Sequence, residues 1–250
     1  TRCLDIKARK IMKLNENFLH VILIVLIALI VLQKSQNGQI SAETTLLQKA
    51  ADGDVQAQLA VAHNFEKGIG VEKNAAQAVH WYQQAAEQGN AKGEFMYGWA
   101  LAYGFGVNAN QTEGLKWMQR AAEKDYPDAT VFTAWAYLKG EGTAQNYEKA
   151  AYWYLKAEQH GLKDAYSPLA WMFMSGEGVP KDEKRAYELY KKGAELGDPN
   201  AQFNLGIAYD GGTGVERNIP QALYWYRKAA RQGDQDAQKR IEEIEMYNIQ

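Results

Sequence analysis

Residues 67–89 read KGIGVEKNAAQAVHWYQQAAEQG. Two glycines, Gly68 and Gly70, precede a polar turn and an alanine-rich run around Trp81 and Tyr82. A dinucleotide-binding loop would need a third glycine in the pattern G-x-G-x-x-G after a strand, and a P-loop would end in Gly-Lys-Ser/Thr. The stretch has neither pattern. We therefore interpret the glycine pair as a hinge between two helices.

The glycine pair recurs every 36 residues, and recurrence at a fixed period of this length is the mark of a repeat protein. The pairs are Gly68/Gly70, Gly104/Gly106, Gly140/Gly142, Gly176/Gly178 and Gly212/Gly214. Each pair is followed at a constant step by a residue that can cap a helix: Asn74, Asn110, Asn146, Asp182 and Asn218. A later column is expected to end the second helix of each repeat: Gly89, Asp125, Gly161, Gly197 and Gly233.

Each repeat is therefore predicted to contain two helices, at about 54–67 and 75–88 in the first repeat. Apolar residues four apart, such as Ala57, Val61 and Phe65, place an apolar stripe on one face of the first helix. Neither helix can bury its stripe alone, so the pairs must stack. The stripe of the second helix carries a tryptophan column that we assign to the core: Trp81, Trp117, Trp153 and Trp225, interrupted by Leu189.

These columns resemble the Sel1-like repeat family, a relative of the tetratricopeptide repeat. The fifth repeat, AQFNLGIAYDGGTGVERNIPQALYWYRKAARQG at 201–233, matches the family pattern almost throughout, whereas the third departs from it at Thr133 and Thr143. The resemblance covers about residues 44–248 and implies an all-α, right-handed α-solenoid of five 36-residue helix-turn-helix repeats with flanking half repeats. Residues 44–53 are expected to end a preceding second helix, and 234–248 to form a closing first helix.

Composition sets limits on the kind of partner. The net charge of the 250 residues is −2, and the repeats hold no long basic run, so the electrostatic footprint of nucleic-acid binding is missing. Cys3 is the single cysteine, which excludes an intramolecular disulfide. Packing alone is therefore expected to hold the repeats together.

The N-terminal region differs in kind. Residues 18–32, FLHVILIVLIALIVL, would span about 22 Å as a helix, less than the roughly 30 Å of a bilayer core, which suits a short membrane anchor or a signal-peptide apolar region. Basic residues precede it: Arg2, Lys7, Arg9, Lys10 and Lys13. The positive-inside rule then predicts that residues 1–17 are cytoplasmic and that the repeats face the periplasm beyond a linker at 33–43. Met12 is an alternative start.

Cleavage of this segment is the alternative to anchoring. The residues at Ile40–Ala42 are a poor cleavage site, so we predict an uncleaved, single-pass anchor in a bacterial inner membrane. Cleavage would instead release the repeats as a soluble periplasmic protein. A third interpretation, a buried core helix at 18–32, is disfavoured because nothing amphipathic surrounds it.

Catalytic motifs are missing from the repeats. The four histidines are predicted to fall in different helices: His20, His63, His80 and His160. Neither H-E-x-x-H nor G-x-S-x-G occurs. We therefore expect no enzyme activity, no cofactor and no metal site. A hydrolase with two converging carboxylates is the remote alternative.

A second aromatic column marks a candidate binding face. Trp99, Trp135 and Trp171 lie two residues after the core stripe of the first helices, so they point about 200° away from it. By the resemblance, this face lines a concave, protein-binding groove. The predicted groove residues are His63, Phe95, Trp99, Tyr103, Trp135, Leu138, Trp171, Met174 and Phe203. The alternative is that these tryptophans pack against the next helix. Pro168 is predicted to lie mid-helix and to kink the chain before Trp171.

The resemblance implies a protein that holds another protein. Its leading specific version is an immunity protein that neutralises a secreted lipase-type effector. The alternative is an envelope scaffold or regulatory adaptor that assembles membrane-associated complexes.

Overall fold

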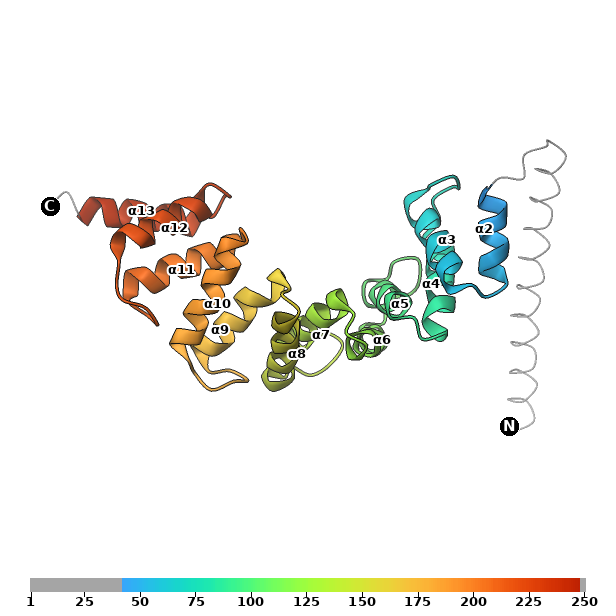
Figure 1. The fold of residues 1–250 in the computed structure, drawn as a ribbon, viewed down its shortest axis with the longest axis horizontal. Helices are drawn as coiled ribbons and strands as arrows, with labels where there is room; N and C mark the ends of the chain where they lie inside the picture. The colour runs from blue at the N-terminus through green and yellow to red at the C-terminus, as the bar shows by residue number, and fades with distance from the viewer. Residues whose placement is uncertain (1–41, 248–250) are drawn as a thin grey trace. The chain divides into compact units, whose positions relative to one another are not determined.

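The computed structural model describes residues 42–247, and its side chains over 46–246. This part of the chain holds twelve α-helices, one short 3-10 helix and no strand. The helices are α2 (Ala42–Ala51), α3 (Val55–Lys67), α4 (Ala75–Glu87), α5 (Ala91–Tyr103), α6 (Gln111–Glu123), α7 (Pro127–Lys139), α8 (Tyr147–Gln159), η1 (Lys163–Ala165), α9 (Tyr166–Ser175), α10 (Glu183–Glu195), α11 (Pro199–Gly211), α12 (Ile219–Ala230) and α13 (Gln235–Tyr247) (Figure 1). The all-helical repeat architecture predicted from the period is confirmed, and the right-handed sense of the array stays a prediction.

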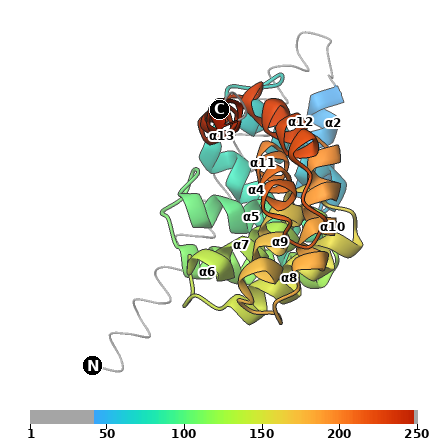
Figure 2. The same cartoon turned by 90° about the vertical axis from the view of Figure 1, so that its left-hand side faces the viewer.

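The helices fall into two compact units, the first ending at Lys73 and the second beginning at Asn74. In the first unit, α2 packs against α3. In the second unit, each helix from α4 to α13 packs against the next one in the chain, and α12 and α13 lie side by side at its C-terminal end (Figures 1 and 2). The predicted anchor at 18–32 lies outside the described residues.

The predicted caps are confirmed in every repeat. The Asn74 side chain accepts a hydrogen bond of 3.0 Å from the backbone N–H of Gln77, and the equivalent residues do the same: Asn110, Asn146, Asp182 and Asn218. The predicted helix ends at the glycine column adopt positive φ, and Asp125 does so at 61° without being a glycine. Local chemistry therefore sets where the second helix of each repeat begins and ends.

In four of the five hinges the second glycine is required by a close contact as well as by its backbone angle: Gly106, Gly142, Gly178 and Gly214. Gly178 has a φ of 76°, and a Cβ built on it would lie 2.2 Å from the carbonyl oxygen of Tyr147. A Cβ on Gly214 would lie 2.1 Å from the carbonyl oxygen of Glu183. Each of these four hinges thus packs directly on the start of the second helix of the preceding repeat, which leaves no room for a side chain.

Three of the four tryptophans predicted to lie in the core are buried as expected. Trp81, Trp153 and Trp225 are buried, and Trp117 is half-buried, with the Arg120 guanidinium carbon 4.3 Å from its ring centre. Small residues fill the column where first and second helices approach closely, and all of them are buried: Ala57, Gly93, Ala129, Ala165, Ala201 and Ala237.

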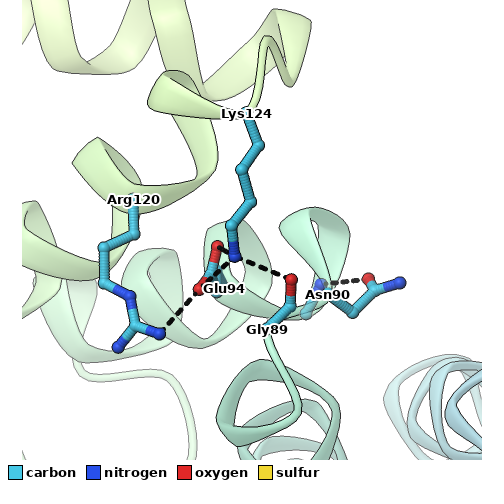
Figure 3. Close-up of polar contacts among 6 residues, drawn as sticks. Gly89, Asn90, Glu94, Arg120 and Lys124 are labelled. Carbon is cyan, nitrogen blue, oxygen red and sulfur yellow. Dashed lines mark hydrogen bonds and ion pairs between the residues drawn. The ribbon is translucent and has the colours of Figure 1, made fainter.

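A buried carboxylate ties three consecutive helices together at the start of the second unit. Glu94 in α5 is fully buried, and Lys124 Nζ lies 2.8 Å from both of its carboxylate oxygens (Figure 3). The same ammonium donates to the carbonyl oxygen of Gly89 at 2.7 Å, and Arg120 lies 3.0 Å from Glu94 Oε1. The cluster therefore links the end of α4 to α5 and α6.

Three repeats later, a neutral pair occupies the same positions. Gln232 Nε2 donates to Gln202 Oε1 at 2.8 Å and to the carbonyl oxygen of Gly197 at 3.2 Å. The geometry is thus shared between repeats, whereas the charge is particular to Glu94 and Lys124.

The predicted kink at Pro168 is wrong because the first helix of the fourth repeat, α9, is shorter than the period implies. Its opening turn is the 3-10 segment η1, and α9 begins only at Tyr166. Pro168 is therefore the third residue of α9, where a backbone N–H would have no partner within the helix. Pro127 and Pro199 lie at helix starts, as predicted.

Buried tyrosines make stability depend on pH at the alkaline end. Burial raises the pKa of Tyr190 from 10.0 to about 12. The unfolded chain loses this proton near pH 10, so the folded state binds more protons between the two values and loses stability as pH rises. Between neutral pH and pH 12, the free energy of unfolding of the wild type is expected to fall. We expect the fall to be smaller in Tyr190→Phe, by on the order of 2 kcal/mol, because phenylalanine has no proton to lose. Urea unfolding at neutral and alkaline pH measures this, and parallel losses in both proteins would contradict it.

Candidate protein-binding surface

The predicted groove residues occupy three kinds of environment. His63 is exposed and belongs to the first unit. Phe95 is buried in the core of the second unit, where its ring lies 5.3 Å from that of Tyr126 and 5.5 Å from that of Phe132. Phe203 is half-buried, with its ring 5.7 Å from that of Tyr226. The remaining six side chains come from α5, α7 and α9 of the second unit and are half-buried or exposed: Trp99, Tyr103, Trp135, Leu138, Trp171 and Met174.

The α5 residues form a small aromatic cluster. Trp99 is half-buried, and its ring lies 5.4 Å from that of Tyr103 and 5.7 Å from that of Phe105 in the hinge. Tyr103 itself is 48% exposed. Trp99 therefore both packs within its own repeat and supports an exposed tyrosine.

A larger cleft opens between α7, α8 and α9. Its volume is about 550 Å³, and its lining is Trp135, Leu138, Lys139, Gln145, Tyr147, Tyr154, Pro168 and Trp171. We call this the aromatic cleft. Trp171 is 40% exposed, and its ring centre lies 6.1 Å from that of Tyr147. A volume of this size lies in the range of ligand-binding pockets.

Sequence reasoning included three residues of the cleft and missed five. Trp135, Leu138 and Trp171 were predicted, because they share one face of the first helices. Tyr147 comes from the start of the second helix α8, a face that the prediction did not consider. Its column offered a signal, since the equivalent positions hold no other aromatic residue: Ala75, Gln111, Glu183 and Ile219.

The equivalent place one repeat earlier is nearly filled. The cavity there has a volume of about 20 Å³, and Phe132 occupies the position that corresponds to Pro168. Tyr103 likewise corresponds to Lys139 of the cleft. Two rings thus take up space that a proline and an exposed lysine leave open, which accounts for the opening at one repeat.

Acidic residues flank the aromatic rings. Glu141 lines the small cavity together with Trp135. Burial and the negative charge of Glu177 raise the pKa of Tyr147, which places that carboxylate beside the cleft. Glu177 Oε2 is buried and has no hydrogen-bond partner within the described structure. Lys139 is the cation in the lining, and it is exposed.

The arrangement offers apolar and charged contacts. Within residues 42–247, no three histidine, cysteine, aspartate or glutamate side chains gather as a metal site would require. The aromatic rings and carboxylates suit recognition of a side chain or a peptide segment, for which exposed tryptophan and tyrosine are the favoured anchors. None of the helices in this part of the chain combines the length and the apolar character that crossing a bilayer needs.

The fold and this surface define an all-helical repeat solenoid suited to protein–protein interaction. Five consecutive segments match the Sel1 repeat family, at residues 55–90, 91–126, 127–162, 164–198 and 199–234. The chain therefore belongs to the Sel1 repeat family. No curated protein sequence matches it.

Solved structures of similar proteins agree with this assignment. A Sel1 repeat protein from Oxalobacter formigenes is 36% identical, with a TM-score of 0.70 over 81% of this chain and 78% of that one. A protective antigen present in uropathogenic Escherichia coli strains is 30% identical, with a TM-score of 0.75 over 80% of this chain but 43% of that one. An immunity protein from Pseudomonas aeruginosa is 21% identical over 73% of this chain and 67% of its own, with a TM-score of 0.44.

Proposed function

We propose that this protein binds another protein through the aromatic cleft and the neighbouring Trp99–Tyr103 surface. The observation that carries the proposal is the exposed ring of Trp171 at the edge of a cleft of about 550 Å³. An apolar ring of this size is costly to leave in water, and tryptophan is over-represented among the residues that dominate binding energy. A repeat array presents such a surface already formed, so little ordering entropy opposes binding.

A paired set of variants tests this proposal. We expect Trp135→Ala/Trp171→Ala to lose the partner, with at least a tenfold weaker affinity, because the variant removes both tryptophans of the cleft. The matched control is Tyr152→Ala/Tyr224→Ala, which removes two tyrosines that are 59% and 48% exposed on α8 and α12. Capture from extracts of the source organism by the full chain, followed by titration of the captured protein, provides the measurement.

The outcome depends on folding being intact. Circular dichroism and thermal melting show whether the tryptophan variant keeps its helices. A partner retained by both variants would contradict the proposal, and so would a partner lost equally from both. If the melting temperature of the tryptophan variant is far below that of the wild type, the two rings serve mainly to pack the helices.

The finer versions of this function are also proposals. As an immunity protein, the chain would form one tight complex with a secreted lipase-type effector and block its activity, which a lipase assay with the purified pair measures. As an envelope scaffold or adaptor, it would instead bind several partners weakly. The resemblance supports both versions. Capture of one tightly bound protein would favour the immunity protein, and capture of several weakly bound proteins would favour the adaptor.

The location of the protein belongs to the same proposal. An inner-membrane anchor at 18–32 would place the repeats in the periplasm, which rests on the apolar run and the basic residues before it. Fractionation of cells, with protease applied to the outer face of spheroplasts, tests this. Digestion of the repeats only in broken cells would contradict it.

A further inference from the structure

We infer that the aromatic cleft binds an arginine side chain of the partner protein. The inference rests on the proposed function, since it names the group of the partner that enters the cleft. It is carried by the position of two carboxylates beside the rings and by a buried carboxylate oxygen that lacks a donor.

The carboxylates are not required by the fold. Glu141 and Glu177 stand between the two glycines of the third and fourth hinges, where the other repeats have neutral residues: Ile69, Phe105 and Thr213. The hinge therefore forms equally well without an acid. Acids occur in the two hinges that adjoin Trp135 and Tyr147.

One oxygen of the Glu177 carboxylate lacks a hydrogen-bond donor, although the Tyr147 hydroxyl hydrogen-bonds to the same carboxylate. Glu177 Oε2 is buried without a partner in the described structure, and leaving a buried charged acceptor unpaired is costly. A donor supplied by a bound group would remove this cost. Since the lining holds the rings of Trp135, Tyr147 and Trp171, that group would lie against aromatic faces.

Aromatic faces and a carboxylate together favour a guanidinium group. Its planar cation stacks on an aromatic ring and donates several hydrogen bonds to a carboxylate. The chain itself shows this pairing, because the Arg120 guanidinium lies 4.3 Å from the Trp117 ring centre and 3.0 Å from a Glu94 oxygen. The cleft and the acids beside it hold the same two elements, aromatic rings and carboxylates.

The charge balance points in the same direction. Glu141 lines the neighbouring cavity together with Trp135, and Glu177 interacts with Tyr147, so two negative charges lie beside the rings, whereas the cleft lining itself carries the positive charge of Lys139. The Lys139 side chain is exposed, so water screens its charge more than it screens the partly buried acids. The local field therefore attracts a cation.

Short blocked peptides test this inference without knowledge of the partner. The probes are acetyl-Gly-Arg-Gly-amide, its citrulline counterpart, which is a neutral isostere, and its glutamate counterpart. The readout is the shift of the indole N–H signals of Trp135 and Trp171 in NMR spectra, assigned with single Trp→Phe variants. We expect the arginine peptide to bind at least tenfold more tightly than the citrulline peptide, and the glutamate peptide to leave the signals unchanged.

Two variants with opposite expected effects complete the test. Glu177→Gln is expected to weaken arginine-peptide binding about tenfold, and Lys139→Gln to strengthen it, because that change removes a positive charge from the lining. Equal binding of arginine and citrulline peptides, or no shift with any peptide, would overturn the inference. If the glutamate peptide binds most tightly, and if Lys139→Gln weakens that binding, the inference is overturned and the cleft binds an acidic side chain instead. Each of these failures leaves the tryptophan-dependent capture of a partner intact, so it is distinguishable from failure of the proposed function.

Discussion

Replacing Gly178 with alanine is expected to lower the free energy of unfolding by at least about 3 kcal/mol. Part of the cost is the left-handed backbone, with φ at 76°, which an alanine adopts at a cost of roughly 1 kcal/mol. The larger part is steric. The new Cβ would lie 2.2 Å from the carbonyl oxygen of Tyr147, and a backbone atom cannot rotate away as a side chain can.

Gly161→Ala is the matched control for this prediction. Gly161 has a similar φ of 71°, but a Cβ there would meet nothing within 4 Å. Its expected cost is therefore about 1 kcal/mol, from the backbone angle alone. Urea unfolding followed by circular dichroism measures both variants. Equal losses would show that the hinge yields to the added methyl group.

The Gly178 variant should also reach the binding surface. The clash falls on the first residue of α8, whose side chain lines the aromatic cleft. Because the hinge and the cleft share Tyr147, we expect partner binding to weaken in Gly178→Ala and to be unchanged in Gly161→Ala.

Removal of the cation from the Glu94 cluster is expected to cost about 2 kcal/mol. In Lys124→Gln, the fully buried carboxylate of Glu94 would keep Arg120, which is half exposed, as its remaining ion-pair partner. The loss is smaller than for a wholly buried pair because Lys124 is itself 42% exposed.

The double variant Glu94→Gln/Lys124→Gln should recover most of this loss. It recreates the neutral pair that Gln202 and Gln232 form three repeats later, at 2.8 Å. A thermodynamic cycle with Glu94→Gln completes the measurement. We expect a coupling free energy of about 1 to 2 kcal/mol. Additive losses from the two single variants would contradict the idea that the charges act as a pair.

Features that depend on interactions within a few residues of the chain were predicted correctly from the sequence. The caps at Asn74 and its equivalents are local, since one side chain satisfies a backbone N–H three residues away. The packed face of the second helices was likewise predictable from spacing along a single helix. Pro168 was misplaced because a period fixes the length of a repeat and does not fix where a helix within it starts.

The binding surface was only partly predictable. The face of Trp135 and Trp171 followed from helical spacing, but their exposure depends on what the neighbouring helices place over them. Phe95 shares a helix with Trp99, yet it is buried because Tyr126, the last residue of its own repeat, and Phe132 of the next repeat cover it. Tyr147 enters the cleft from another helix, which no single-helix pattern contains.

By itself the sequence therefore determined the repeat, its hinges, its caps and its core stripe, because glycine backbone angles, N-cap hydrogen bonds and helical spacing act within a few residues. Only the tertiary structure decided where a cleft opens. That depends on the volumes of side chains 36 residues apart, such as Phe132 and Pro168, set against neighbours from other helices. Packing is a property of the space between helices, and a linear pattern does not record it.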